Sequence, residues 1–210
     1  MCGVAAIFSN DINLENQISK VIKRISHRGP DDNGFYTNNN LSLGSCRLSI
    51  FDFSVNAKMP MTDSLNRYVV VYNGEIYNFP EIKKKFNIQT KTNTDTEILL
   101  EMYVKKGTEC VKYFNGIFSF VIYDKIKETI FCCRDRLGIK PLYYYLNNKV
   151  FIACSEIKGI HEIIPKSINY DKLKTYLKTS FYDFSEQTFY KDVKQLEPAH
   201  YFIFDLKKKS

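Results

Sequence analysis

The sequence predicts an α+β fold in which antiparallel sheets are covered by helices. Apolar runs typical of strands come in pairs separated by short polar stretches, as at residues 117–123 with 129–133 and residues 142–146 with 150–154. Segments with helical spacing are grouped between these pairs and do not alternate one by one with strands. No Gly-rich phosphate loop follows a strand, which argues against an ATP or dinucleotide site in these residues.

The first quarter of the chain contains a strand, a helix and a second strand. Residues 4–8 are a short apolar run that predicts a strand beginning almost at the first residue, so we expect the amino terminus to be buried or tied down. Apolar residues at helical spacing predict an amphipathic helix over residues 14–25. The Gly- and Asp-rich stretch at residues 29–34 ends it, and residues 41–50 predict the next strand.

The middle of the chain predicts a strand, a turn and two helices. Residues 68–72 indicate a strand that runs into Asn73-Gly74, a dipeptide that tolerates positive φ and favours a tight turn. Pro80 suits the first turn of a short helix. The sequence TDTE at residues 94–97 is typical of a capping box at the start of a longer helix, which Gly107 is expected to end.

The rest of the chain adds helical patterns at residues 155–161 and 171–177 and a last strand at residues 201–204. No internal repeat or low-complexity linker interrupts it. With 210 residues and 44% hydrophobic composition, the chain has enough apolar material for one sizeable core. We therefore predict a single domain over residues 1–210.

Composition argues against several classes of function. The formal charge is +7, but lysines are scattered over surface-like stretches such as residues 83–85 and 207–209, which indicates a solvated face, and no nucleic-acid recognition motif occurs. The sequence has no apolar run of about 18 residues and no export signal, so neither a membrane span nor secretion is expected. Six cysteines without a CxxC pair predict reduced thiols in the cytoplasm and no metal site.

Cys2 is a candidate nucleophile because of its position. A small second residue permits removal of Met1, which would leave a thiol and a free α-amine on one residue. An α-amine with an ordinary pKa of about 7.7–8.0 accepts the thiol proton near physiological pH, directly or through one water. Position alone is weak support, since many proteins have a small residue there by accident.

Several short motifs give Cys2 a context, and their order along nearly the whole chain resembles that of class II glutamine amidotransferases. The forms NGEIYN and RDRLGIKPLYY are most similar to those of asparagine synthetases. The motifs are MCGV at residues 1–4, HRGPD at 27–31, RLSI at 47–50, YNGEIYN at 72–78, TDTE at 94–97, RDRLGIKPLYY at 134–144 and SEIK at 155–158.

The resemblance implies a fold and a reaction. The fold is the N-terminal-nucleophile hydrolase αββα sandwich of two antiparallel sheets, in agreement with the strand and helix pattern. The Cys2 thiol attacks the side-chain amide of L-glutamine, ammonia leaves, and the glutamyl thioester is hydrolysed to glutamate. The matching oxyanion donors are the Asn73 side chain and the Gly74 backbone N–H. An ordinary turn is the alternative explanation of Asn73-Gly74.

The resemblance also implies how free glutamine is recognised. Arg47 suits the α-carboxylate, because its planar fork binds two oxygens at once. Glu75 and Asp95 match the α-ammonium end, and the backbone near Ile50 completes the pocket. Alternative roles are a surface ion pair for Arg47, a solvated turn residue for Glu75 and a helix-dipole charge for Asp95, which has room for both roles.

Other residues of the motifs receive no catalytic role. His27 is expected to be structural, since the Cys2 amine already supplies a base. Residues 134–144 suit a face toward a synthetase domain and the ammonia path, although a buried strand and turn explain them nearly as well. Cys132 and Cys133 lie in an expected strand, where packing accounts for them.

The partners follow from the resemblance. ATP and magnesium are expected only in a synthetase domain, on the same or another chain, and no cofactor is expected in this one. The sequence reaches Ser210 about where that domain would begin, and Pro198-Ala199-His200 replaces the more usual Pro-Gly-His. A homodimer is compatible with the sequence. The alternatives are a glutaminase that serves another acceptor, such as a sugar, and a non-catalytic module that retains the fold.

Overall fold

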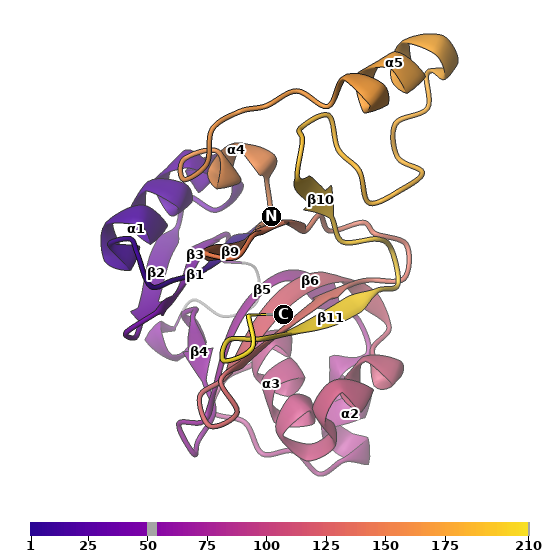
Figure 1. Cartoon of the computed structure of the whole chain (residues 1–210). Coiled ribbons are helices and arrows are strands. Elements are labelled where there is room, and N and C mark those ends of the chain that lie inside the picture. Colours follow the sequence, from indigo (N-terminus) through magenta and orange to yellow (C-terminus); the bar gives the residue numbers. More distant parts are fainter. Residues whose placement is uncertain (50–53, 210) are drawn as a thin grey trace.

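The computed structural model describes residues 1–49 and 54–209, and in it two antiparallel sheets pack face to face (Figure 1). One sheet has the strand order β10-β8-β9-β1-β3-β2 and the other β11-β7-β6-β5-β4. The strands of the first sheet are β1 (Gly3–Ser9), β2 (Asp32–Thr37), β3 (Leu41–Arg47), β8 (Tyr143–Leu146), β9 (Val150–Cys154) and β10 (Val193–Gln195). Those of the second are β4 (Met61–Thr62), β5 (Tyr68–Ile76), β6 (Gly116–Asp124), β7 (Thr129–Arg134) and β11 (Tyr201–Asp205).

Helices cover the outer face of each sheet. On the first sheet, α1 (Leu14–Arg24) and α4 (Ile157–Ile160) bury apolar side chains against β1 and β9. On the second, α2 (Phe79–Lys85) and α3 (Asp95–Lys106) pack on β5, β6 and β7. A third apolar core lies between the sheets, which gives the predicted four-layer αββα arrangement.

Strand β1 lies inside the first sheet, with β3 on one side and β9 on the other. Val4 and Ala6 face the core between the sheets, whereas Ala5 and Ile7 face α1. Burial on both faces explains the uninterrupted apolar run at the start of the sequence. The first residues of the chain are therefore held at the end of a buried strand, as predicted.

The structure confirms most of the predicted elements, including both hairpins and all the predicted helices. The short strands β2, β4 and β10 were not predicted. Thr94 caps α3 by accepting from the Glu97 N–H at 3.3 Å, but the Glu97 carboxylate accepts from the amides of Lys91 and Thr92 and completes no capping box there. Gly107 ends α3 with φ of 57°, as expected.

The predicted turn at Asn73-Gly74 is wrong. Both residues lie within β5, where Asn73 pairs with Ser119 and Gly74 with Phe118 on β6. Cross-strand pairing overrides the local preference of the dipeptide. Glycine is needed here for space and not for positive φ, because a Cβ on Gly74 would lie 2.5 Å from the Ile117 carbonyl oxygen.

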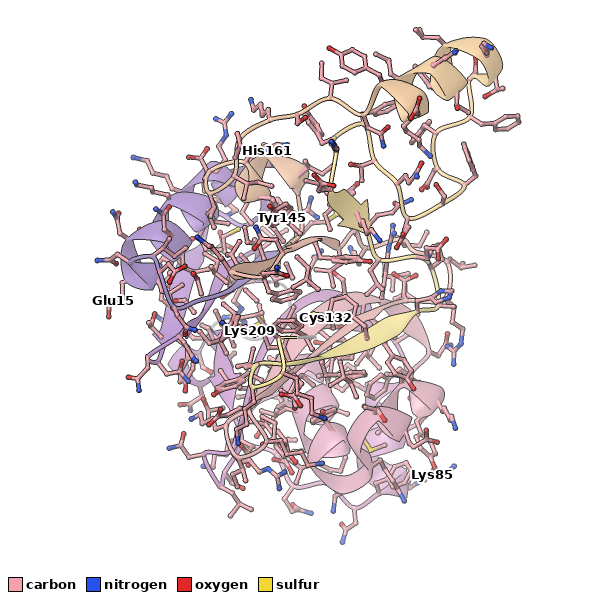
Figure 2. The ribbon with its side chains drawn as sticks, in the orientation of Figure 1. Glu15, Lys85, Cys132, Tyr145, His161 and Lys209 are labelled. Carbon is pink, nitrogen blue, oxygen red and sulfur yellow. The ribbon has the colours of Figure 1, made fainter. Side chains whose placement is uncertain are left out.

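Cys132 and Cys133 are adjacent in β7 but face different apolar cores. Cys132 packs between the sheets and Cys133 beneath α3, so both cysteines are core residues, and Figure 2 shows Cys132 in the interior of the molecule.

The helix α5 (Tyr170–Thr179) projects from the two-sheet body (Figure 1). Among the helices of the described residues, none has both the length and the apolar character required to cross a membrane.

Ser155 fastens the start of β1 to the end of β9 through two hydrogen bonds. The Val4 N–H donates to Ser155 Oγ at 3.0 Å, and the Ser155 N–H donates to the Val4 carbonyl at 2.9 Å. Ser155→Ala should lower the free energy of unfolding by about 1–3 kcal/mol, because it leaves a buried N–H without its acceptor. Urea unfolding measures the change. Exposed Ser64→Ala is the matched control, and an equal effect of the two variants would contradict this role of Ser155.

Candidate active site

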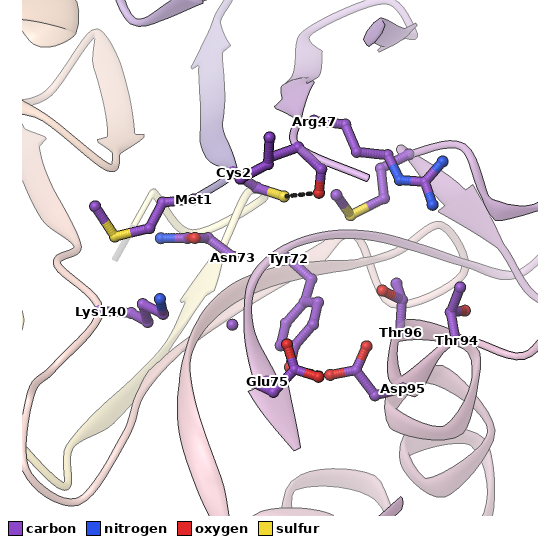
Figure 3. Close-up of a pocket in the computed structure, with 13 residues that line it drawn as sticks. Met1, Cys2, Arg47, Tyr72, Asn73, Glu75, Thr94, Asp95, Thr96 and Lys140 are labelled. Carbon is purple, nitrogen blue, oxygen red and sulfur yellow. Dashed lines mark hydrogen bonds between the residues drawn. The ribbon is translucent and has the colours of Figure 1, made fainter. Parts of the chain in front are cut away.

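A pocket lies where the start of β1, the end of β3, the end of β5 and the start of α3 come together (Figure 3). It brings together six of the seven predicted site residues, and the seventh, Ile50, lies outside the described residues. The lining consists of Met1, Cys2, Arg47, Leu48, Met59, Tyr72, Asn73, Gly74, Glu75, Thr94, Asp95, Thr96 and Lys140.

Cys2 immediately precedes β1, and its half-buried Sγ lies 3.8 Å from the Leu48 carbonyl oxygen. Burial raises the pKa of this thiol, and the positive charges of the Met1 amino terminus and of Arg47 act in the opposite direction. The thiol therefore stays largely protonated near neutral pH and needs a base to become a nucleophile. In this structure the α-nitrogen of Cys2 is part of the peptide bond to Met1.

The backbone of Cys2 is held by a buried arginine. Arg28 Nε donates to the Cys2 carbonyl at 3.0 Å, and its Nη1 forms a 2.8 Å ion pair with Glu156. His27 also contacts Glu156, at 2.8 Å, and it does not line the pocket. Because Arg28 is only 9% exposed, this pair holds the backbone of Cys2 in a partly desolvated setting.

Asn73 presents a buried amide that has no hydrogen-bond partner in the part of the chain that the structure describes. Its side chain is 1% exposed, and among the described residues neither Nδ2 nor Oδ1 makes a hydrogen bond. A buried amide without partners costs on the order of 1–3 kcal/mol, so native structures contain few of them. An unpaired donor beside a cysteine thiol is what an oxyanion-binding group requires before its ligand arrives.

The Gly74 N–H points to the same side of β5 as the pocket. Phe118, the partner of Gly74 on β6, uses both its N–H and its carbonyl for hydrogen bonds to Asp135. The pair is therefore of the non-hydrogen-bonded kind, and the Gly74 N–H is directed away from β6. The N–H of Ile76, two residues later, also points away from β6, since it donates to Asp95 Oδ2 at 2.8 Å.

Two carboxyl groups face each other in the pocket (Figure 3). Asp95, in the first turn of α3, accepts from the Tyr72 hydroxyl at 2.6 Å and from the Ile76 N–H. Burial raises the pKa of Asp95 despite these bonds. Burial and the neighbouring Asp95 raise the pKa of Glu75 from 4.5 to about 7, and Lys140 acts in the opposite direction. Such a pair strongly favours an incoming cation.

Arg47 ends β3 and lines the pocket beside Cys2. The backbone around it is held by Asp31, whose N–H donates to the Arg47 carbonyl at 3.0 Å and whose carboxylate accepts from the Ser49 N–H at 2.7 Å. A cation near one part of the pocket and two carboxyl groups at another match a zwitterionic amino acid. Together with a thiol, the Asn73 amide and the Gly74 N–H, the geometry suits acyl transfer from the side chain of an amino acid.

Sequence reasoning missed the residues that support the site. Arg28, Glu156 and Lys140 received no role, although each belongs to a quoted motif. Their function depends on contacts such as that between Arg28 and Glu156, which are 128 positions apart. The one signal available was that these charged residues fall within the motifs that carry the family resemblance.

Comparisons with known proteins agree with this geometry. A family model described as a glutamine amidotransferase domain matches residues 1–210. The chain is 43% identical to a putative glutamine-hydrolysing asparagine synthetase of Methanocaldococcus jannaschii and 32% identical to the rat asparagine synthetase. The matches cover 100% and 99% of this chain but only 45% and 34% of those relatives, so the chain spans less than half of their length.

Solved structures are similar in fold. The glutamine phosphoribosylpyrophosphate amidotransferase of B. subtilis matches with a TM-score of 0.70 at 16% identity. An allosteric regulatory enzyme of purine biosynthesis matches with a TM-score of 0.74 at 14% identity. Each match covers 97% of this chain and 47% of the other. These similarities confirm the predicted N-terminal-nucleophile hydrolase sandwich.

The high pKa of Glu75 gives a prediction for stability. Between about pH 4.5 and pH 7 the folded state holds a proton that the unfolded state releases, so ionisation of Glu75 opposes folding as the pH rises through this window. Glu75→Gln should therefore stabilise the protein above pH 7, by about 1–2 kcal/mol once solvent screening is allowed for, and have little effect below pH 4.5.

Thermal unfolding at several pH values measures this difference. Asp11→Asn, which removes an exposed negative charge, is the control and should show no such dependence on pH. Equal stability of Glu75→Gln and the unchanged protein at about pH 8 would contradict the conclusion that ionised Glu75 destabilises the folded state.

Proposed function

The chain belongs to the glutamine amidotransferase domain family, and from this premise we propose that it hydrolyses L-glutamine to glutamate and ammonia with Cys2 as the nucleophile. The observation that carries the proposal is the buried Asn73 amide, which lies in the same pocket as Cys2 and has no hydrogen-bond partner among the described residues. A structural asparagine would be hydrogen-bonded, whereas a donor that meets a developing oxyanion is paired only during the reaction.

The reaction begins with removal of Met1, which frees the α-amine of Cys2. The amine accepts the thiol proton, and Sγ forms a bond to the side-chain carbonyl carbon of glutamine. Asn73 Nδ2 and the Gly74 N–H donate to the carbonyl oxygen as it becomes negative. The proton passes to the leaving nitrogen, the C–N bond breaks and ammonia departs. Water then attacks the thioester, which yields glutamate and restores the thiol.

Substrate recognition uses the charges of the pocket. The Arg47 guanidinium pairs with the α-carboxylate, and Glu75 with Asp95 takes the α-ammonium. Tyr72 supports the arrangement, because its hydroxyl holds the Asp95 carboxylate in place.

The released ammonia passes to an ATP-dependent synthetase domain, on the same or another chain, that makes asparagine. Support comes from the relatives named as glutamine-hydrolysing asparagine synthetases. The glutaminase half needs no cofactor, since its chemistry uses a thiol, a base and two hydrogen-bond donors. A reactive thiol of this kind suits a reducing compartment, and we place the protein in the cytoplasm.

The test of this function uses the Met1-free chain with glutamine in the absence of ATP and magnesium. It should release glutamate and ammonia in equal amounts, and Cys2→Ala should abolish both because no other pocket residue supplies a thiol. A chain that retains Met1 should be nearly inactive, since its Cys2 nitrogen is not a base. Cys110→Ala, which removes a buried thiol outside the pocket, is the control for folding and should retain turnover.

Two results would overturn the proposal. Normal turnover by Cys2→Ala would remove the nucleophile from the mechanism. Failure of the folded, Met1-free chain to bind or hydrolyse glutamine would favour a non-catalytic module. Adding aspartate and ATP should yield neither asparagine nor AMP, and their appearance would show that a nucleotide site had been missed.

Arg47→Ala tests recognition of the α-carboxylate. The variant should lose about 1.5–3 kcal/mol of glutamine binding, seen mainly as a higher KM, because it loses a charge-assisted pair. For 4-aminobutanamide, a glutamine analogue without the α-carboxylate, the same substitution should change binding little. Arg24→Ala, at an exposed ion pair with Glu162, is the control. An equal loss for both ligands would assign Arg47 another role.

A further inference from the structure

Lys140 is a charged residue of the pocket that the proposed mechanism does not use. It lies in the segment that connects β7 to β8 and is half-buried. The other charged side chains that line the pocket are Arg47, Glu75 and Asp95, each with a proposed role in binding. In Figure 3, Lys140 extends into the pocket on the side of Asn73 and Glu75.

The backbone of Lys140 is held on both sides. Its N–H donates to Asp135 Oδ2 at 2.9 Å, and its carbonyl accepts from Arg134 Nε at 3.0 Å. Asp135 and Arg134 are 1% and 7% exposed, so these bonds are shielded from water. Asp135 also accepts from the N–H groups of Phe118, Leu137 and Ile139.

The next residue ties the same segment to the sheet. Ser119 Oγ donates to the Pro141 carbonyl at 3.1 Å, and Ser119 is the partner of Asn73 in the register of β5 and β6. The position of Lys140 is therefore fixed relative to the strand that carries Asn73 and Glu75.

Lys140 is the second positively charged side chain among the described residues that line the pocket. Arg47 and Lys140 contribute two positive charges, and ionised Glu75 and Asp95 contribute two negative charges, to which a zwitterionic amino acid adds none. Two close, partly buried carboxyl groups tend to share a proton, and a nearby cation opposes this tendency. Around Glu75 the groups that interact electrostatically are Asp95 from α3, Lys140 from its loop and Tyr72 from β5 itself.

We propose that Lys140 is a positioning residue that favours the ionised form of Glu75 and thereby helps to set the pH range in which the pocket binds the α-ammonium group. This inference rests on the proposed glutaminase function. The physical step is competition: a proton on Glu75 must leave before the substrate cation binds, and Lys140 makes it leave at a lower pH.

Steady-state kinetics of the Met1-free chain between about pH 5.5 and pH 8.5 tests the proposal. In the unchanged protein, KM for glutamine should rise as the pH falls below about 7, where Glu75 takes up its proton. In Lys140→Met, which keeps the length of the side chain, this rise should begin at higher pH, with KM roughly threefold to tenfold larger at neutral pH. Lys140→Arg should restore the original profile, and kcat should stay within about twofold at the alkaline end.

A double-mutant comparison separates this role from others. In the Glu75→Gln background, Lys140→Met should cause little further change in the pH profile of KM, because the group on which it acts is gone. An unchanged profile in Lys140→Met would overturn the proposal. A fall in kcat at every pH, with KM unaltered, would also overturn it, since Lys140 would then act on the reacting amide.

Glutamine binding to Cys2→Ala, measured by calorimetry at about pH 6 and pH 8, distinguishes the two levels of inference. If this variant does not bind glutamine, the proposed function fails. If it binds glutamine and Lys140→Met leaves the pH dependence of binding unchanged, only the role of Lys140 fails. The comparison is between Cys2→Ala and Cys2→Ala with Lys140→Met. The α-amine of residue 2 titrates in both of these variants, so its effect cancels.

Discussion

The site depends on one constraint: the chain begins in the middle of a sheet. Because β1 is hydrogen-bonded to β3 on one side and to β9 on the other, the residue before it has a fixed position at the end of a buried strand. Arg28 and Ser155 extend this hold to the backbone on either side of Gly3. An amino-terminal nucleophile requires such support, since chain termini are otherwise poorly ordered.

The same pocket contains features that oppose stability. An unpaired, buried amide at Asn73 and two close carboxyl groups at Glu75 and Asp95 all raise the free energy of the folded state. Elsewhere in the core, buried charges have partners, as Asp124 does in its 2.7 Å ion pair with Arg67. The proposed binding of a zwitterionic ligand accounts for such unfavourable groups in one pocket, since this ligand would supply a partner for each of them.

The sequence predicted the long elements because their apolar patterns are local and strong. Strands β2, β4 and β10 were not predicted. Strands β4 and β10 are very short, and β2 begins inside the Gly- and Asp-rich stretch at residues 29–34. At Asn73-Gly74 a turn was predicted where the structure has a strand. The dipeptide favours turns, but here its glycine allows close approach to β6. The candidate site was reached through motifs, whereas the roles of Arg28 and Lys140 depend on three-dimensional contacts that no local pattern contains.

The two-sheet architecture also sets the geometry of the proposed chemistry. Cys2 immediately precedes β1 of the first sheet, and Asn73 and Gly74 belong to β5 of the second, so the proposed nucleophile and the proposed oxyanion donors meet only because the sheets are packed together. Val4 and Val71 are among the side chains that fill the space between them. A displacement of about 1 Å between reacting groups is enough to lose much of the rate. The apolar core between the sheets therefore sets the distance between Cys2 and the proposed donors, which ties the geometry of the proposed reaction directly to the packing that stabilises the fold.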